Sequence, residues 1–133
     1  MLVNIDFNSI VLKIKSMANK LGLIDDYVVE RGTSGIWTYR KWNSGVYEAW
    51  GNTTKSITFS GAAWNMGYAG ARQTVTVPIV KSIKYAGVSA QTSNGALVIN
   101  VSFSDNKLSF YPINDLSNTV NTFLSYYVVG TWK

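Results

Sequence analysis

Apolar residues at the start of the chain recur in steps that alternate between four and three positions. A mean step of about 3.5 residues predicts a helix with the narrow apolar seam of a coiled coil, rather than the broad stripe of a helix lying on a globular core. Polar residues fill most of the other positions. The seam consists of Val3, Phe7, Ile10, Ile14, Met17, Leu21 and Ile24.

The seam also predicts how many chains associate. β-branched residues occur at both of its core positions, which favours three strands over two. A helix of about three heptads is marginal in water by itself, so it needs partner helices. We therefore expect residues 1–26 to form the coiled-coil neck of a homotrimer, with an interface made by Phe7, Ile10, Ile14, Met17, Leu21 and Ile24.

Two further features bear on this neck. Ile5, Val11, Leu12 and Leu23 widen the apolar face, so a single amphipathic helix docked on its own sheet is the alternative. The seam is already running at the first residues, which indicates the C-terminal piece of a longer rod.

After Tyr27 the apolar spacing changes to a period of two, which is the pattern of half-buried strands. Turn-forming residues separate the runs at Asn43-Ser44-Gly45, Gly51-Asn52, Asn94-Gly95 and Asp105-Asn106. No strand–helix–strand rhythm occurs, so residues 27–133 predict an antiparallel, jelly-roll-like β-sandwich head. The expected strands are 36–42, 46–51, 55–59, 73–77, 81–88, 96–104, 107–112 and 123–132, with a long loop over 60–72.

Composition excludes several kinds of chemistry. The chain has 133 residues with no Cys and no His, which excludes disulfides, Cys nucleophiles and imidazole bases or ligands; we expect no metal and no cofactor. The net charge is +5, but the basic residues are spread thinly, so no nucleic-acid partner is expected. No secretory signal opens the chain, and no apolar run approaches the ~20 residues of a membrane helix, so we expect no membrane insertion.

One motif carries more specific information. Residues 26–45, DYVVERGTSGIWTYRKWNSG, are followed by Glu48 and by Trp50-Gly51, and the chain closes with YVVGTWK at 127–133. Physically the Trp37–Gly45 part is a strand entering a hairpin. Together these runs resemble a signature of tail-fibre, baseplate or minor structural proteins from phages of Gram-positive bacteria. Those proteins often carry a Cys where this chain has Ala49, which we expect to be a small buried residue.

The resemblance implies a trimeric tip domain that attaches a virion to its host. Receptors of such proteins are often cell-wall polysaccharides or teichoic acids. On this reading the N-terminal side joins the rest of the tail fibre or baseplate, and the protein is made in the bacterial cytoplasm without a signal peptide and resides in the phage tail. A host cell-wall saccharide is then the expected partner.

Sugar recognition needs flat aromatic faces and planar polar side chains. We expect the ligand-binding residues to be Trp64, Asn65, Tyr68 and Arg72, because they lie in a Gly-rich loop and function concentrates on loops held by a rigid scaffold. The aromatic residues of the first hairpin are expected in the core or between subunits. Among them, Trp37, Tyr39 and Trp42 are the candidates for the trimer interface.

Two other functions stay open at this stage. A polysaccharide depolymerase needs two facing carboxylates, but Glu48 is the one acid in a predicted strand, where an ion pair across the hairpin is its expected role. We therefore expect no enzyme activity. A purely structural module that trimerises or caps a fibre would need the same neck and head, so the sequence does not distinguish it from a receptor-binding tip.

Overall fold

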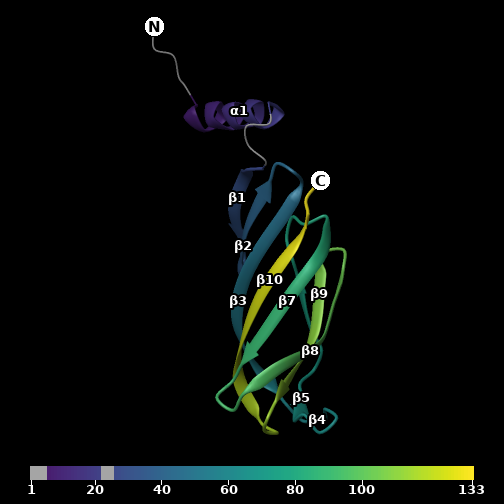
Figure 1. Ribbon diagram of the computed structural model, residues 1–133. Helices are drawn as coiled ribbons and strands as arrows, with labels where there is room; N and C mark the ends of the chain where they lie inside the picture. Colours follow the sequence, from purple (N-terminus) through teal and green to yellow (C-terminus); the bar gives the residue numbers. More distant parts are fainter. Residues whose placement is uncertain (1–5, 22–25) are drawn as a thin grey trace.

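The computed structural model describes residues 6–21 and 26–133, which form one helix and ten strands within those ranges (Figure 1). The elements in chain order are α1 (Phe7–Lys20), β1 (Val28–Ser34), β2 (Trp37–Trp42), β3 (Val46–Thr58), β4 (Gly61–Ala62), β5 (Tyr68–Ala69), β6 (Gln73–Thr76), β7 (Ser82–Gln91), β8 (Ala96–Ser104), β9 (Lys107–Asn114) and β10 (Thr119–Thr131).

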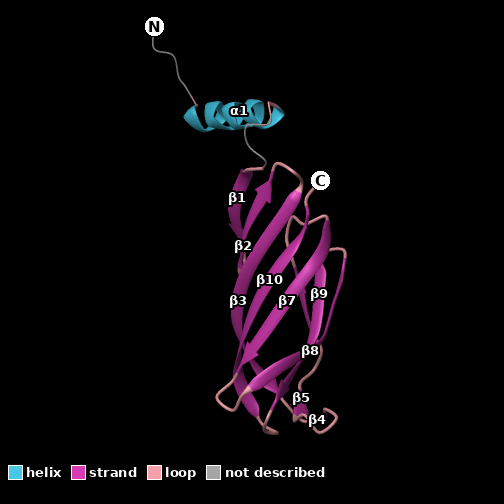
Figure 2. Cartoon of the chain, viewed as in Figure 1, coloured by secondary structure: helices cyan, strands magenta, loops and turns pink. Residues whose placement is uncertain are grey.

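The strands form two sheets (Figure 2), and neighbouring strands within each sheet are antiparallel. The first sheet has the order β1-β2-β3-β10-β7. In the second sheet β9 is central: Ser109 pairs with Ser102 of β8 on one edge and with Thr74 of β6 on the other. β5 pairs with the far end of β9, and β4 pairs with β5. The predicted antiparallel β fold is thus confirmed.

The core lies between the two sheets and follows from alternation along the strands. In β10, Leu124, Tyr126 and Val128 are buried, whereas the residues between them face outward or are less buried. The ring of Tyr126 lies 5.5 Å from that of Trp37 in β2 and 5.9 Å from that of Phe110 in β9. Tyr126 therefore joins the two sheets through aromatic contacts.

The strand boundaries confirm part of the prediction. β8 spans the predicted 96–104, and the turns at Asn43-Ser44-Gly45, Asn94-Gly95 and Asp105-Asn106 all lie between strands. The predicted turn at Gly51-Asn52 is wrong, because Gly51 continues β3 and pairs with both Trp37 and Tyr126. The sequence prediction also missed β1, and the expected loop over 60–72 contains β4 and β5.

The helix lies beyond one end of the sandwich (Figure 1). The Asp6 carboxylate caps it by accepting hydrogen bonds from the backbone N–H groups of Asn8 and Ser9, at 3.1 and 3.3 Å. Its apolar side chains are exposed, so docking on its own sheet is not observed. The exposed set is Phe7, Ile10, Val11, Leu12, Ile14 and Met17, with Leu21 just beyond the helix end. Ile24, the last predicted seam residue, lies outside the described residues.

Candidate functional site

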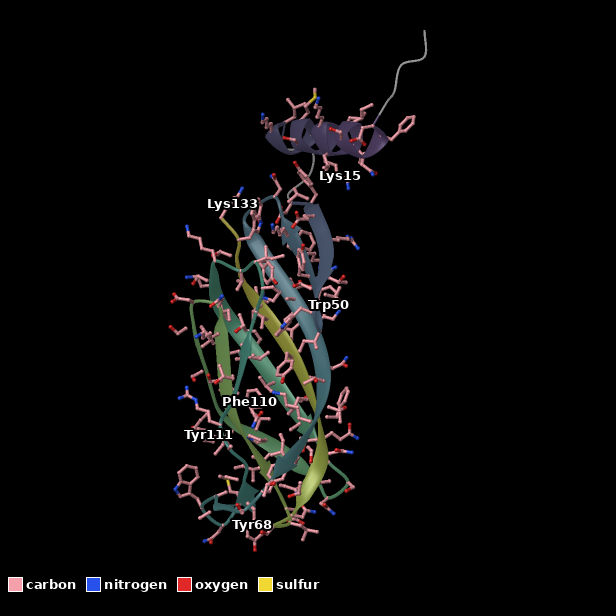
Figure 3. The ribbon with its side chains drawn as sticks, turned by 180° about the vertical axis from the view of Figure 1, so that it is seen from behind. Lys15, Trp50, Tyr68, Phe110, Tyr111 and Lys133 are labelled. Carbon is pink, nitrogen blue, oxygen red and sulfur yellow. The ribbon has the colours of Figure 1, made fainter. Side chains whose placement is uncertain are left out.

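The loop that carries the predicted ligand residues lies at the end of the sandwich away from α1, beside β4 and β5 (Figure 1). Figure 3 shows Tyr68 at this end and Lys15 of the helix at the other. The loop is anchored at both sides: the N–H of Phe59 donates to the carbonyl oxygen of Asn118 at 2.8 Å, and that of Gly70 donates to the carbonyl oxygen of Pro112 at 2.9 Å. We call residues 59–70 the tip loop.

The tip loop has an unusual backbone between β4 and β5. Trp64 and Asn65 have φ angles of 47° and 62°, the left-handed region that L-residues with bulky side chains rarely adopt. The N–H of Met66 donates to the carbonyl oxygen of Ala63 at 2.8 Å and closes the turn. Gly67, with φ 124°, approaches the carbonyl oxygen of Asn114 too closely to carry a side chain. This turn holds the Trp64 side chain in solvent, where 75% of it is exposed.

Trp64, Asn65 and Tyr68 line one hollow of about 660 Å³, together with Ser60, Ala62, Ala63 and Gly67. The structure thus brings together three of the four predicted ligand residues. Arg72 is the exception: it is exposed after the tip loop, between β5 and β6, and is not among the described residues that line the hollow. The reason is the hydrogen bond at Gly70, which returns the chain to β9 before Arg72 is reached.

The hollow combines an aromatic face with polar groups. The indole of Trp64 offers a flat apolar surface, while Ser60, Asn65 and Tyr68 carry hydroxyl and amide groups that can donate and accept hydrogen bonds. Such a combination suits a ligand with one apolar face and many hydroxyls, which describes a sugar ring. Within the described part of the chain, no group of acidic residues is placed to hold a metal ion.

A second, smaller hollow of about 240 Å³ adjoins the first. Tyr111 of β9 and Ile99 and Asn100 of β8 line it, and the sequence prediction missed all three. One signal was present in the sequence: Asn100 interrupts an apolar run, and in the structure it lies at a bulge between Ile99 and Ser102 with φ 53°. What the sequence does not contain is the proximity of this bulge to Trp64.

A polar network around one buried residue, Asn114, supports the tip loop from beneath. The Asn114 side chain, which is 0% exposed, accepts a hydrogen bond from the Thr92 hydroxyl at 2.7 Å. Its amide nitrogen donates to the carbonyl oxygen of Leu116 at 3.0 Å and to Oδ1 of Asn118 at 2.8 Å. Asn118 in turn donates to Asn94 at 3.2 Å. Since Gly67 packs on the backbone of Asn114, this network fixes the position of the tip loop.

The outer face of the first sheet presents a different cluster. Nε and Nη2 of Arg40 donate to one carboxylate oxygen of Glu48, at 2.9 and 2.5 Å, which confirms the predicted ion pair across the hairpin. The guanidinium carbon lies 5.4 Å from the ring centroid of Trp42 and 5.3 Å from that of Trp50. Burial and the nearby Glu48 carboxylate raise the pKa of Tyr127.

The structure places two of the predicted interface residues on the side of β2 that faces the second sheet. Trp37 is 4% exposed and packs on Tyr126 inside its own protomer, and Tyr39 stacks on Tyr47 with ring centroids 5.9 Å apart. Trp37 belongs to the core and the half-buried Tyr39 packs against it, because both residues lie on the face of β2 that points to the second sheet. Trp42, on the outer face, stays a candidate for the interface. Ala49 is fully buried, as expected for a small residue at this position.

Comparison with solved structures identifies the architecture. The model superposes on a Pseudomonas aeruginosa R1 pyocin fibre comprising its C-terminal residues 323–701, with a TM-score of 0.63 and 13% sequence identity over 98% of this chain. The fold is similar to that of pyocin tail fibres. An N-truncated R1-type pyocin tail fibre matches 87% of this chain with a TM-score of 0.62 and 13% identity, and an N-truncated R2-type fibre matches 98% with a TM-score of 0.51 and 11% identity.

The three pyocin fibres differ in how much of their own length this chain covers. This chain covers 94% of the N-truncated R1-type fibre, but 38% of the longer R1 fragment and 53% of the R2-type fibre. No family model and no curated protein matches the chain. Within the described residues, none of the helical structure is long and apolar enough to cross a membrane.

Proposed function

We propose that this protein is a non-catalytic receptor-binding domain of a phage tail fibre, and that it attaches the virion to glycans on the host cell surface. The observation that carries the proposal is the tip loop, where a strained backbone holds an exposed Trp64 beside Asn65 and Tyr68 at the rim of a hollow. An indole held in water adds nothing to the stability of the domain, whereas its flat apolar face can stack on a sugar ring.

The position of the tip loop supports attachment. The loop and the N-terminal helix lie at opposite ends of the molecule (Figure 1), so a domain joined to a fibre or baseplate through its N-terminal side would point the hollow outward. The similarity to pyocin tail fibres supports the same arrangement in a virion tail. A Gram-positive host rests on the resemblance of residues 26–45, and a cell-wall polysaccharide or teichoic acid would be its receptor.

The proposed assembly is a homotrimer. An isolated helix of 14 residues with exposed Phe7, Ile14 and Met17 is not expected to be stable in water, and association through the seam would bury these side chains. The outer face of the first sheet would form the second contact with a neighbouring copy. The half-buried Trp42 lies there with the exposed Trp50, since Arg40 contacts both rings, and the exposed Tyr127 pairs with Trp50.

The proposal excludes hydrolysis because the two strand carboxylates of the described residues are both engaged. Arg40 binds Glu48 and Lys41 binds Glu30, and neither carboxylate lines the hollow at the tip. A glycosidase would need a second carboxyl group within about 10 Å of the first, free to exchange a proton with the substrate.

The test is binding of the whole protein to host cells and to purified cell-wall polysaccharide. Trp64→Ala should abolish binding and remove the change of tryptophan fluorescence on adding polysaccharide. Met66→Ala is the matched control, because Met66 is an exposed apolar residue of the same loop that does not line the hollow. Both variants should keep the circular dichroism spectrum of the native protein.

The alternative is a structural module that caps a fibre. It would be favoured if Trp64→Ala bound host cells as tightly as the native protein, or if the native protein bound neither cells nor polysaccharide. Release of reducing sugar from the polysaccharide by the native protein would instead revive the depolymerase.

A further inference from the structure

We propose that the hollow beside Tyr111 is a second sugar subsite, and that the two hollows together bind a neutral oligosaccharide of at least two units. The second unit would carry an apolar substituent such as a methyl or N-acetyl group. This inference rests on the proposed function and specifies its ligand class.

The two hollows share part of their walls. Ala62, Ala63 and Trp64 line both of them, so the hollows meet along the same three residues. Tyr111 and Ile99 are cross-strand partners on β9 and β8, and they form the far wall of the second hollow. An oligosaccharide that stacks one ring on Trp64 can therefore extend toward Tyr111 without leaving the surface.

Volume indicates that the second hollow is an extension and not an independent site. Ligand pockets usually measure about 300–1,000 Å³. The first hollow, at about 660 Å³, lies within this range, and the second, at about 240 Å³, lies below it. The second hollow thus suits one additional group of a ligand that is already held at the first.

The lining sets the charge of the ligand. None of the described residues that line the two hollows is charged. Arg72, the one charged residue among the predicted ligand-binding residues, is not part of the lining. A phosphate or carboxylate bound there would lose water without gaining an opposite charge, which is costly. A neutral glycan is therefore favoured over a polyanion such as a teichoic acid.

Apolar groups make up most of the lining of the second hollow. Ala69 and Ile99 contribute methyl groups, and the Tyr111 ring adds an aromatic surface. Asn100 supplies an amide at the edge of this surface. A sugar with a methyl-bearing substituent would bury that methyl among these side chains while Asn100 bonds a hydroxyl or carbonyl group.

Backbone strain connects the same residues. Among the described residues, five other than glycine have a positive φ, and three of them, Trp64, Asn65 and Asn100, line the hollows. Such conformations are retained when the surrounding structure enforces them, and they cluster at ligand sites. The strain lies at both hollows, as expected if both contact one ligand.

The experiment is an array of neutral and acidic bacterial mono-, di- and tetrasaccharides, probed with the whole protein and followed by titration of the sugars that bind. Ile99→Ala removes apolar surface from the second hollow, and Asn100→Gly removes the amide at a position where φ 53° suits glycine. Leu97→Ala is the control, since Leu97 lies on the same face of β8 and lines neither hollow.

We expect neutral di- and tetrasaccharides to bind more tightly than monosaccharides. Each of the two variants should weaken disaccharide binding about tenfold, the effect of losing one hydrogen bond or a buried apolar group, and should leave monosaccharide binding unchanged. Preference for acidic glycans, equal binding of mono- and disaccharides, or unchanged binding by both variants would overturn this inference and leave the proposed function standing. Absence of any Trp64-dependent binding, to the array or to host cells, would overturn both.

Discussion

Asn114 illustrates how one buried side chain controls the geometry of a distant loop. Its amide makes three hydrogen bonds, to Thr92, Leu116 and Asn118, and its backbone carbonyl lies against Gly67 of the tip loop. A buried amide with every partner in place is specific for one arrangement, because any displacement leaves polar groups without partners. The position of the exposed Trp64 therefore depends on a buried residue that lines neither hollow.

The first prediction concerns this network. Asn114→Ala should lower the free energy of unfolding by about 1–3 kcal/mol, because it removes three hydrogen bonds made by a fully buried side chain. Asn94→Ala should cost less, since Asn94 accepts one long bond of 3.2 Å from Asn118 at the rim of the network. Urea denaturation measures both. An equal loss in the two variants would contradict the central role of Asn114.

Tyr47 makes stability sensitive to alkaline pH. Tyr47 is 0% exposed, and its hydroxyl donates a hydrogen bond to the carbonyl oxygen of Pro78 at 2.6 Å. This burial raises the pKa of Tyr47. The folded state thus holds the phenolic proton more tightly than the unfolded chain does. Its contribution to stability is complete below the ordinary tyrosine pKa of 10.0 and is lost as pH rises from there toward the folded pKa.

The second prediction concerns this loss of stability at alkaline pH. Tyr47→Phe should cost about 0.5–1.5 kcal/mol at neutral pH, through the lost hydrogen bond, but should flatten the fall of stability at high pH. Burial also raises the pKa of Tyr126, so part of the alkaline fall should persist. Thermal melts across this pH range test the prediction, with Tyr85→Phe as the control at an exposed position. An unchanged alkaline slope in Tyr47→Phe would refute it.

At the scale of elements, the helix and the sandwich differ in whether their apolar side chains are buried. The strands of the sandwich bury one face against the other sheet, as β10 does with Leu124 and Val128. The helix α1 has no such surface: Ile14 and Met17 are 60% and 62% exposed. A helix of this length gains most of its stability from packing, so its exposed apolar seam is the feature on which the proposed association rests.

The third prediction places a charge in the seam. Ile14→Asp should convert the proposed trimer into single chains, because three carboxylates would meet in its core. Ser16→Asp introduces the same charge off the seam and should leave the trimer intact. Light scattering distinguishes a mass of 14.7 kDa from three times that value. A native protein that is already a single chain would refute the trimeric neck.

The long strand β3 shows a limit of local turn signals. Gly51-Asn52 looks like a turn in the sequence, but the chain runs straight through it for the whole of Val46–Thr58. Glycine is used there because the carbonyl oxygen of Ile36 leaves no room for a Cβ atom. The same residue type therefore served close packing between strands instead of chain reversal.

At the scale of the whole molecule, the helix proposed for association and the hollow proposed for recognition lie at opposite ends (Figures 1 and 3). The helix and the C-terminal residue Lys133 are at one end, and the tip loop with Tyr68 is at the other. In the proposed trimer, this separation would let three heads present three hollows to one surface without blocking them. Weak binding at each hollow would then combine into strong attachment.

The fourth prediction tests this multivalency. Ile14→Asp should bind a soluble oligosaccharide as the native protein does, but its binding to a surface densely coated with the same sugar should weaken at least ~100-fold. Surface plasmon resonance at high and low sugar density measures the difference. Equal loss of soluble and surface binding would show that the variant damaged the site itself, and no loss in either would show that single heads suffice.

The sequence by itself determined the features that depend on short-range spacing. The 3.5-residue period predicts the helix, the period of two predicts strands such as β8, and Asp105-Asn106 predicts a tight turn, because each depends on neighbours within a few residues. The Gly-rich stretch around Trp64 likewise marked the candidate loop, and three of its four predicted residues share one hollow.

The tertiary structure alone decided which aromatic residues are buried and which meet. Trp37 and Trp64 are the same residue type, yet one is 4% exposed and the other 75%, because pairing of β2 within the first sheet turns Trp37 toward the core. Asn100 and Tyr111 reach Trp64 because β8 and β9 pair beside the tip loop. Such neighbours are far apart in the chain, so their proximity depends on strand order and register, which local sequence patterns do not specify.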